Sequence, residues 1–189
     1  MKKSLFVITI LIFLISCTKK PDYQIEIDNQ VKNINTLEDK KQYLSNLFNK
    51  SQGIINEIEI LEKKFLLNQV EIYKLRKKRD SLIPLNSYRV ESYLKKFEYP
   101  SSDNFNENEK MAIYYAVFND VREKEQLKYF NLFGKLYQDS VINKYNYLGY
   151  LSKVFYLKHA SFFKFDKRHT IDEMIEDITP DIIKIKKAI

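Results

Sequence analysis

The sequence predicts an all-α protein in which a long amphipathic N-terminal helix packs on a C-terminal helical bundle domain. Apolar residues recur at helical spacing through most of the chain, and no segment sustains the alternation that marks a strand. The 189 residues include only 3 Gly and 4 Pro, too few turn-forming residues for a sandwich or barrel of many short strands. We find no internal repeat and no low-complexity segment.

Composition narrows the function classes. Apolar residues make up 44% of the chain and charged residues 30%, which is typical of a globular protein rather than a disordered one. One Cys excludes a disulfide within one chain and a Cys-based zinc site, and two His disfavour a multi-histidine metal site. No phosphate-binding Gly-rich loop, nucleophile elbow or His-Glu-x-x-His motif occurs. We therefore predict no metal and no cofactor.

The N-terminus has the layout of a secretory signal. Lys2 and Lys3 precede an apolar run over 5–15 that only Thr9 interrupts, and this run is too short to span a membrane. It ends in a string that resembles the lipobox of bacterial lipoproteins, Leu14-Ile15-Ser16-Cys17. The alternative is an ordinary signal peptide with an accidental Cys.

The lipobox resemblance implies that 1–16 is a signal peptide cleaved between Ser16 and Cys17. Cys17 would then carry a diacylglycerol on its sulfur and usually a further acyl chain, such as palmitate, on its amine; two or three chains hold a protein stably on a bilayer. The protein would lie in the cell envelope, and Thr18 in place of Asp favours the outer membrane over the inner one. The expected partners are the bilayer and an envelope protein, with no nucleic acid despite a net charge of +7.

The next two segments are a tether and a long helix. Residues 17–35 are rich in Asn and show little helical pattern, which predicts a lipidated tether. Over 36–83, a seven-residue repeat with Thr36 as its cap predicts a long amphipathic helix, with a break plausible near Gly53. Extra apolar residues beside the seam favour packing into a bundle over a free-standing dimeric coiled coil, which remains the alternative.

Residues 84–189 are predicted to form a helical, aromatic-rich domain. Pro84 should end the long helix, and Asn86 or Ser87 should cap a helix that stops before Pro100. A loop over 100–106 follows, and then helices over about 107–119, 121–138 and 141–159. Two capping boxes mark helix starts, Asn106 with Glu109 and Thr170 with Glu173, and Pro180 should bend or restart the last helix.

Four groups of residues are candidates for a site, each beside a simpler interpretation. The aromatics of 86–165 form either a ligand groove, of which no single residue can be named, or a core of Phe and Tyr. Five cations in six positions face anionic lipid or polymer, or lie in the last turns of a helix where cations suit the dipole. Four acids hold a cation or act as an acid/base pair, or form a solvated face. His159 and His169 lack a paired ligand motif. The cations are Lys74, Arg76, Lys77, Lys78 and Arg79, and the acids are Asp172, Glu173, Glu176 and Asp177.

Residues 86–165 resemble an uncharacterised family of small bacterial lipoproteins with a helical domain of unknown function. The resemblance rests on an Asn, an apolar and aromatic series and a turn, then on further apolar and aromatic stretches: Asn86, Val90, Tyr93-Leu94, Phe97-Glu98-Tyr99-Pro100, 112–118, Tyr129-Phe130, Leu136-Tyr137, Leu148-Gly149-Tyr150-Leu151, Val154-Phe155 and Phe163-Lys164-Phe165. Relatives often carry His where this chain has Phe118-Asn119-Asp120, Arg where it has Lys153 and Gly where it has Glu98. No catalytic role follows from the resemblance.

Three hypotheses follow for function. The first is a membrane-anchored envelope lipoprotein that acts as a non-enzymatic interaction or scaffold module, supported by the anchor, the long helix and the missing motifs. The second is a binding module for a hydrophobic or aromatic-stacking ligand. The third is an envelope-directed enzyme that uses Glu176 or His159.

Overall fold

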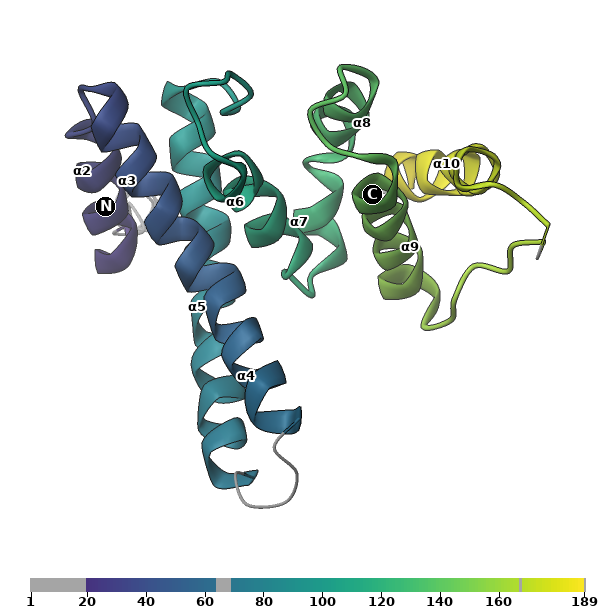
Figure 1. The fold of residues 1–189 in the computed structure, drawn as a ribbon, viewed down its shortest axis with the longest axis horizontal. Coiled ribbons are helices and arrows are strands. Elements are labelled where there is room, and N and C mark those ends of the chain that lie inside the picture. Colours follow the sequence, from purple (N-terminus) through teal and green to yellow (C-terminus); the bar gives the residue numbers. More distant parts are fainter. Residues whose placement is uncertain (1–19, 64–68, 167, 189) are drawn as a thin grey trace, which may run out of the picture.

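The computed structural model describes residues 20–63, 69–166 and 168–188, in which helices joined by loops are present and no strand occurs. This confirms the all-α prediction. Figure 1 shows a body of short helices from which one helical hairpin projects. The elements are α2 (Asp22–Lys32), α3 (Leu37–Phe48), a π-helical segment η1 (Asn49–Gly53), α4 (Ile54–Lys63), α5 (Gln69–Lys96), α6 (Glu107–Phe118), α7 (Glu123–Leu127), α8 (Phe130–Gln138), α9 (Lys144–His159) and α10 (Ile171–Lys187).

The prediction of a tether over 17–35 is wrong for its described part, because residues 22–32 form α2. Ile27 and Val31 lie one turn apart on α2 and are 2% and 3% exposed, buried where α2 packs on α5. From α5, Lys96 Nζ donates hydrogen bonds to the carbonyls of Val31, Lys32 and Ile34 at the end of this helix. A cation at a helix C-terminus satisfies carbonyls that have no partner within the helix. The polar remainder of α2 concealed this short apolar face from the sequence pattern.

The start of α3 and the change near Gly53 match the sequence. Thr36 Oγ1 accepts from the Asp39 N–H at 3.1 Å, and the Asp39 carboxylate accepts from the Thr36 N–H at 2.9 Å, which is a capping box. Helix α3 runs through η1 into α4 without stopping. The helix near Gly53 is therefore not broken but widens into a π-type turn over 49–53.

Polar side chains from other helices satisfy carbonyls of η1. Asn86 of α5 donates its Nδ2 to the Lys50 carbonyl at 3.2 Å, and Asn119 after α6 donates to the Ser51 carbonyl at 3.3 Å. A π-helical turn disturbs the regular α-helical ladder, so such outside donors stabilise it. The irregular segment is thereby tied to both α5 and α6.

The single long helix predicted over 36–83 is wrong, because the chain reverses and α5 runs back along α4 (Figure 1). Two contacts show that the two limbs are antiparallel. Glu62 pairs with Arg76, whereas Lys50, earlier in the chain than Glu62, bonds Asn86, which is later than Arg76. The repeat itself was identified correctly, since its residues form the hairpin's own core. That core consists of Ile54, Ile58, Ile72 and Leu75, with Leu61 and Leu82 packed on it. The apolar seam of α4 thus packs on that of α5 in the same chain.

Helix α5 also continues through Pro84, which was predicted to end it. The predicted boundary at 84 therefore falls inside a helix. Asn86 and Ser87, predicted as caps, are instead buried at 3% and 7% exposure, where both side chains make hydrogen bonds to other segments. The expected stop before Pro100 and the loop over 100–106 are confirmed.

The C-terminal half follows the prediction more closely. Both capping boxes are present, Asn106 with Glu109 at α6 and Thr170 with Glu173 at α10, and Pro180 lies inside α10. The helix predicted over 121–138 is two helices, α7 and α8, because Tyr129 between them has φ −99° and ψ 3°. Helix α10 packs along α9, and α3 packs along α6. Among the described helices, none has both the length and the apolar content that crossing a bilayer requires.

Candidate functional site

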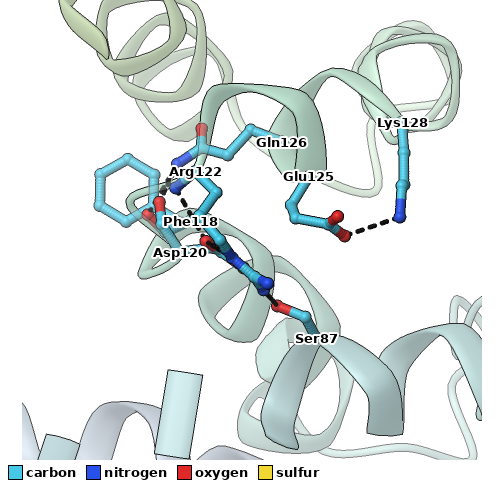
Figure 2. A network of polar contacts seen from close by, with 7 residues as sticks. All are labelled: Ser87, Phe118, Asp120, Arg122, Glu125, Gln126 and Lys128. Carbon is cyan, nitrogen blue, oxygen red and sulfur yellow. Dashed lines mark hydrogen bonds and ion pairs between the residues drawn. The ribbon is translucent and has the colours of Figure 1, made fainter. Parts of the chain in front are cut away.

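The most extensive polar network among the described residues is built on Asp120, just after α6. Its side chain is 1% exposed, and the Arg122 guanidinium donates two hydrogen bonds to it, from Nη2 to Oδ2 at 2.6 Å and from Nε to Oδ1 at 2.9 Å (Figure 2). Ser87 Oγ of α5 donates to Oδ2, and the Arg122 N–H donates to Oδ1 at 2.8 Å. Burial acts to raise the pKa of Asp120, but these donors outweigh it and hold the pKa below its usual value.

Gln126 of α7 connects the network to the rest of the core. Its Nε2 donates to the Asp120 carbonyl at 2.5 Å and to the Phe118 carbonyl at 3.3 Å, while Tyr150 OH of α9 donates to the Gln126 carbonyl at 2.8 Å. The Gln126 Oε1 atom is buried and has no hydrogen-bond partner in the described part of the chain. Glu125 and Lys128 pair at 2.8 Å beside this network and do not reach Asp120 (Figure 2).

Lys153 of α9 approaches the same place from the other side. Its Nζ donates to the Phe118 carbonyl and lies 4.6 Å from the centre of the Phe118 ring. Burial lowers the pKa of the Lys153 amine to about 8, although the nearby Asp120 charge acts in the opposite direction. A cation at the last carbonyls of α6 complements the negative end of that helix.

This arrangement holds helices together rather than presenting a reactive group. Both oxygens of Asp120 are occupied by donors of the chain, and its side chain is almost fully covered. The family resemblance expects His at Phe118-Asn119-Asp120 and Arg at Lys153. Lys153 bonds the Phe118 carbonyl, but the Asn119 side chain instead bonds the Ser51 carbonyl of η1. In this chain Asp120 accepts from Ser87 of α5, its carbonyl accepts from Gln126 of α7, and Lys153 of α9 donates to the end of α6. These bonds join the four helices.

The acidic cluster at the start of α10 is divided among separate partners. Asp172 Oδ2 lies 3.1 Å from Lys144 Nζ, and Glu173 is used in the capping box of Thr170. Asp177 Oδ2 lies 2.7 Å from His169 Nδ1. Within the described residues, no three His, Cys, Asp or Glu side chains gather as a metal site would require.

The two histidines have different surroundings. His169 makes the contact with Asp177, whereas His159 ends α9 with its ring centre 4.4 Å from that of Phe155. Among the described residues, the contact of His169 with Asp177 is the one that joins either histidine to the acidic cluster.

Most aromatics of 86–165 pack on one another, which supports the core interpretation. The Phe133 ring lies 4.9 Å from Tyr150 and 5.5 Å from Tyr114, centre to centre, and all three side chains are buried. Phe97 and Tyr99 also line a cavity of about 460 Å³ between the end of α5 and α8.

The basic cluster is the sequence candidate whose simpler interpretation is wrong. Its five cations were expected in the last turns of a helix, but α5 extends to Lys96, so they lie in its first half. Cations there gain nothing from the helix dipole, which favours them near the C-terminus. Arg76 pairs with Glu62 and Arg79 with Asp80, whereas no carboxylate of the described residues lies within 4.0 Å of Lys74, Lys77 or Lys78.

Beside these lysines, the hairpin exposes large apolar side chains. Val70 is 70% exposed and Tyr73 61%, and Lys77 Nζ stands 5.6 Å from the centre of the Tyr73 ring. Val70, Tyr73, Lys74 and Lys77 follow helical spacing and share one face of α5, here called the arm face. Val70 and Tyr73 are among the apolar residues beside the seam, whose pattern predicts burial in a bundle, so their exposure corrects that prediction.

Comparison with protein-family models, with curated proteins and with solved structures finds no match for this chain. The function must therefore be argued from the residues of this chain. Ser16 and Cys17, the predicted cleavage and lipidation positions, lie outside the described residues.

Proposed function

We propose that this chain is a membrane-anchored cell-envelope lipoprotein that acts as a non-enzymatic interaction or scaffold module. In this proposal acylated Cys17 attaches it to a bilayer, and where two membranes exist Thr18 favours the outer one. The arm face then binds an envelope protein. The observation that carries the proposal is the combination, on a hairpin that projects from the body, of exposed apolar side chains with lysines that have no carboxylate of the described chain within 4.0 Å (Figure 1).

The chemistry of the arm face indicates the kind of partner. Large apolar side chains such as Val70 and Tyr73 gain free energy when a partner covers them, and Tyr is enriched where interfaces bind tightly. Lys74 and Lys77 would meet carboxylates, which steer association and select the partner. We therefore infer a protein partner with an acidic rim around an apolar patch.

The anchor is tested at Cys17. Cys17→Ser should abolish incorporation of labelled palmitate and release the protein from the membrane fraction, because no other cysteine can take the lipid. Labelling that persists in Cys17→Ser would contradict the lipoprotein assignment. A signal-peptide variant at Thr9, which keeps Cys17, provides the matched control.

The partner is tested by a photo-crosslinking amino acid placed at Tyr73 in living cells. Tyr145, 67% exposed on α9, is the matched control position. We expect one dominant protein adduct from position 73 and none from position 145. Reversal of the two arm-face charges, Lys74→Glu with Lys77→Glu, should lower that adduct about tenfold, since each exposed pair contributes up to about 1 kcal/mol.

Three outcomes would contradict the partner proposal. Equal adducts from positions 73 and 145 would indicate non-specific contact. An adduct that resists the charge reversal would show that the lysines do not select it. Crosslinks to lipid alone would make the arm face a membrane contact instead.

A further inference from the structure

A further unexplained feature of the described residues is a cavity at the junction of α2, α3, η1 and α5. Its volume is about 430 Å³, within the range of small-molecule sites. The walls come from Gln30 of α2, Asn33 and Ile34 just after it, Asp39, Gln42, Tyr43 and Asn46 of α3, Lys50 of η1 and Arg89 of α5. The arm face contributes none of them.

Two cations line this cavity without an acidic partner. Within the described chain no carboxylate lies within 4.0 Å of Lys50 or Arg89. Arg89 is half-buried, and its one hydrogen bond to a side chain runs from Nη1 to Asn86 Oδ1 at 2.8 Å. Burial lowers the pKa of both groups, and the positive charge of Arg89 lowers that of Lys50 further.

The one carboxylate among the wall residues is already used. Asp39 Oδ2 accepts from the N–H groups of Asn35 and Thr36 at 3.0 and 2.9 Å, as the cap of α3. Glu26 of α2 attracts both cations from a greater distance and forms no ion pair with either. The cavity therefore holds two positive charges against one capped carboxylate.

The remaining polar lining suits a ligand with hydrogen-bonding groups. In the described part of the chain, the carboxamides of Asn33, Gln42 and Asn46 make no hydrogen bond to protein, whereas Gln30 Nε2 donates to Glu26. Carboxamides offer both donors and acceptors, so they bind hydroxyl, carbonyl and anionic oxygens alike. Arg suits planar two-point binding of carboxylate or phosphate, and Lys supplies a point charge.

We propose that this cavity binds an anionic small molecule, whose phosphate or carboxylate group lies between Lys50 and Arg89 while its polar groups meet the carboxamides of α2 and α3. The site goes beyond the interaction function proposed above and uses different residues. It has a mechanical consequence, because the ligand would join α2, which directly follows the predicted anchor, to α3 and α5. Occupancy would then strengthen the existing attachment of the anchor-proximal helix to α3 and α5.

The test measures thermal unfolding of the full chain with inorganic phosphate, with succinate and with chloride at equal ionic strength. We expect the midpoint to rise saturably with phosphate, succinate or both. The rise should reach about 5 °C or more when the anion exceeds its dissociation constant about a hundredfold, because binding to the folded state alone stabilises it. Saturation by one anion alone identifies the charged group that the site prefers.

Variants separate a site from a general salt effect. Lys50→Gln with Arg89→Gln should lose the rise, whereas Lys124→Gln, which removes an exposed cation of α7 outside the cavity, should keep it. If the double variant does not fold, Lys50→Gln alone serves, since the exposed Lys50 side chain bonds no other described residue. Hydrogen exchange should slow over 30–50 on saturation.

Two results would overturn the site. One is an equal rise in all variants, which would be a salt effect on the whole protein. The other is no rise above chloride with either anion. Neither result bears on the crosslinks expected from position 73, so the two proposals fail separately.

Discussion

The α4–α5 hairpin and the body around α6, α8 and α9 are built from different kinds of side chain. The hairpin core consists of the four buried aliphatic residues Ile54, Ile58, Ile72 and Leu75. The main core contains seven buried aromatics: Tyr93, Tyr99, Tyr114, Tyr129, Phe133, Tyr147 and Tyr150. Aromatic side chains bury about 150–250 Å² each, so the body gains far more per residue from leaving water.

The two regions also use their surfaces differently. Around Asp120, the polar side chains of the body hydrogen-bond to other groups of the chain, so few donors or acceptors are left to bind a ligand. The hairpin leaves Val70 and Tyr73 largely in water beside Lys74 and Lys77, which form no ion pair with another described residue. The contrast indicates a rigid body that positions a hairpin with a small core. Regions with few buried contacts open more readily than a large core. A surface of this kind is better suited to binding than to holding the fold together.

The largest expected effect is in the body, where Phe133→Ala should lower the free energy of unfolding by about 3–5 kcal/mol. Phe133 is 0% exposed and packs on Tyr114 and Tyr150, so its removal leaves a cavity among rings that cannot close it. Chemical denaturation of the whole protein measures this. Phe162→Ala, at a site 78% exposed, is the control and should change stability by no more than about 0.5 kcal/mol.

Ile72→Ala provides the matched change in the hairpin. It should speed hydrogen exchange in α4 and the first half of α5 while leaving α6 and α9 protected, because the small core can open by itself. Exchange that rises equally in α9 would show that arm and body unfold as one unit. The hairpin would then have no lower local stability than the body.

How far the sequence could predict these regions depends on the distance over which its signals act. Capping boxes are local patterns three residues apart, and those at Asn106 and Thr170 were predicted and are present. The heptad residues were also identified, but an apolar seam looks the same whether it meets a second chain or its own returning helix. The sequence from 61 to 69 contains neither Gly nor Pro to indicate that return.

The polar sites could not be predicted from the spacing of residues along the sequence. Ser87, Asp120 and Lys153 come from three separate segments, and the sequence marks none of them as a partner of another. The anion cavity needs α2 as a wall, and α2 was interpreted as a tether. Its two buried residues, Ile27 and Val31, are a single helical repeat, too short a pattern to distinguish from chance.

A smaller effect is expected from Asp120→Asn, at about 2–3 kcal/mol. The amide cannot accept from Ser87 and from both Arg122 nitrogens as the carboxylate does, and a buried charge network that loses one member is destabilised. The cost stays below that of a fully buried pair because the Arg122 side chain is 46% exposed and can turn to water. Asp181→Asn, which breaks the exposed pair with Lys184, is the control and should cost at most about 1 kcal/mol.

The pH dependence tests whether charge is the cause. The pKa of Asp120 is lower in the folded protein than in the unfolded chain, where it is about 3.9. The unfolded state therefore binds the proton first as the pH falls, so the carboxylate contributes fully above that value and its contribution is lost as the pH drops through the folded value. The difference between wild type and Asp120→Asn should be constant near neutral pH and shrink below pH about 4. A difference that persists unchanged in acid would mean that shape, not charge, holds α5, α6 and α7 together at this point.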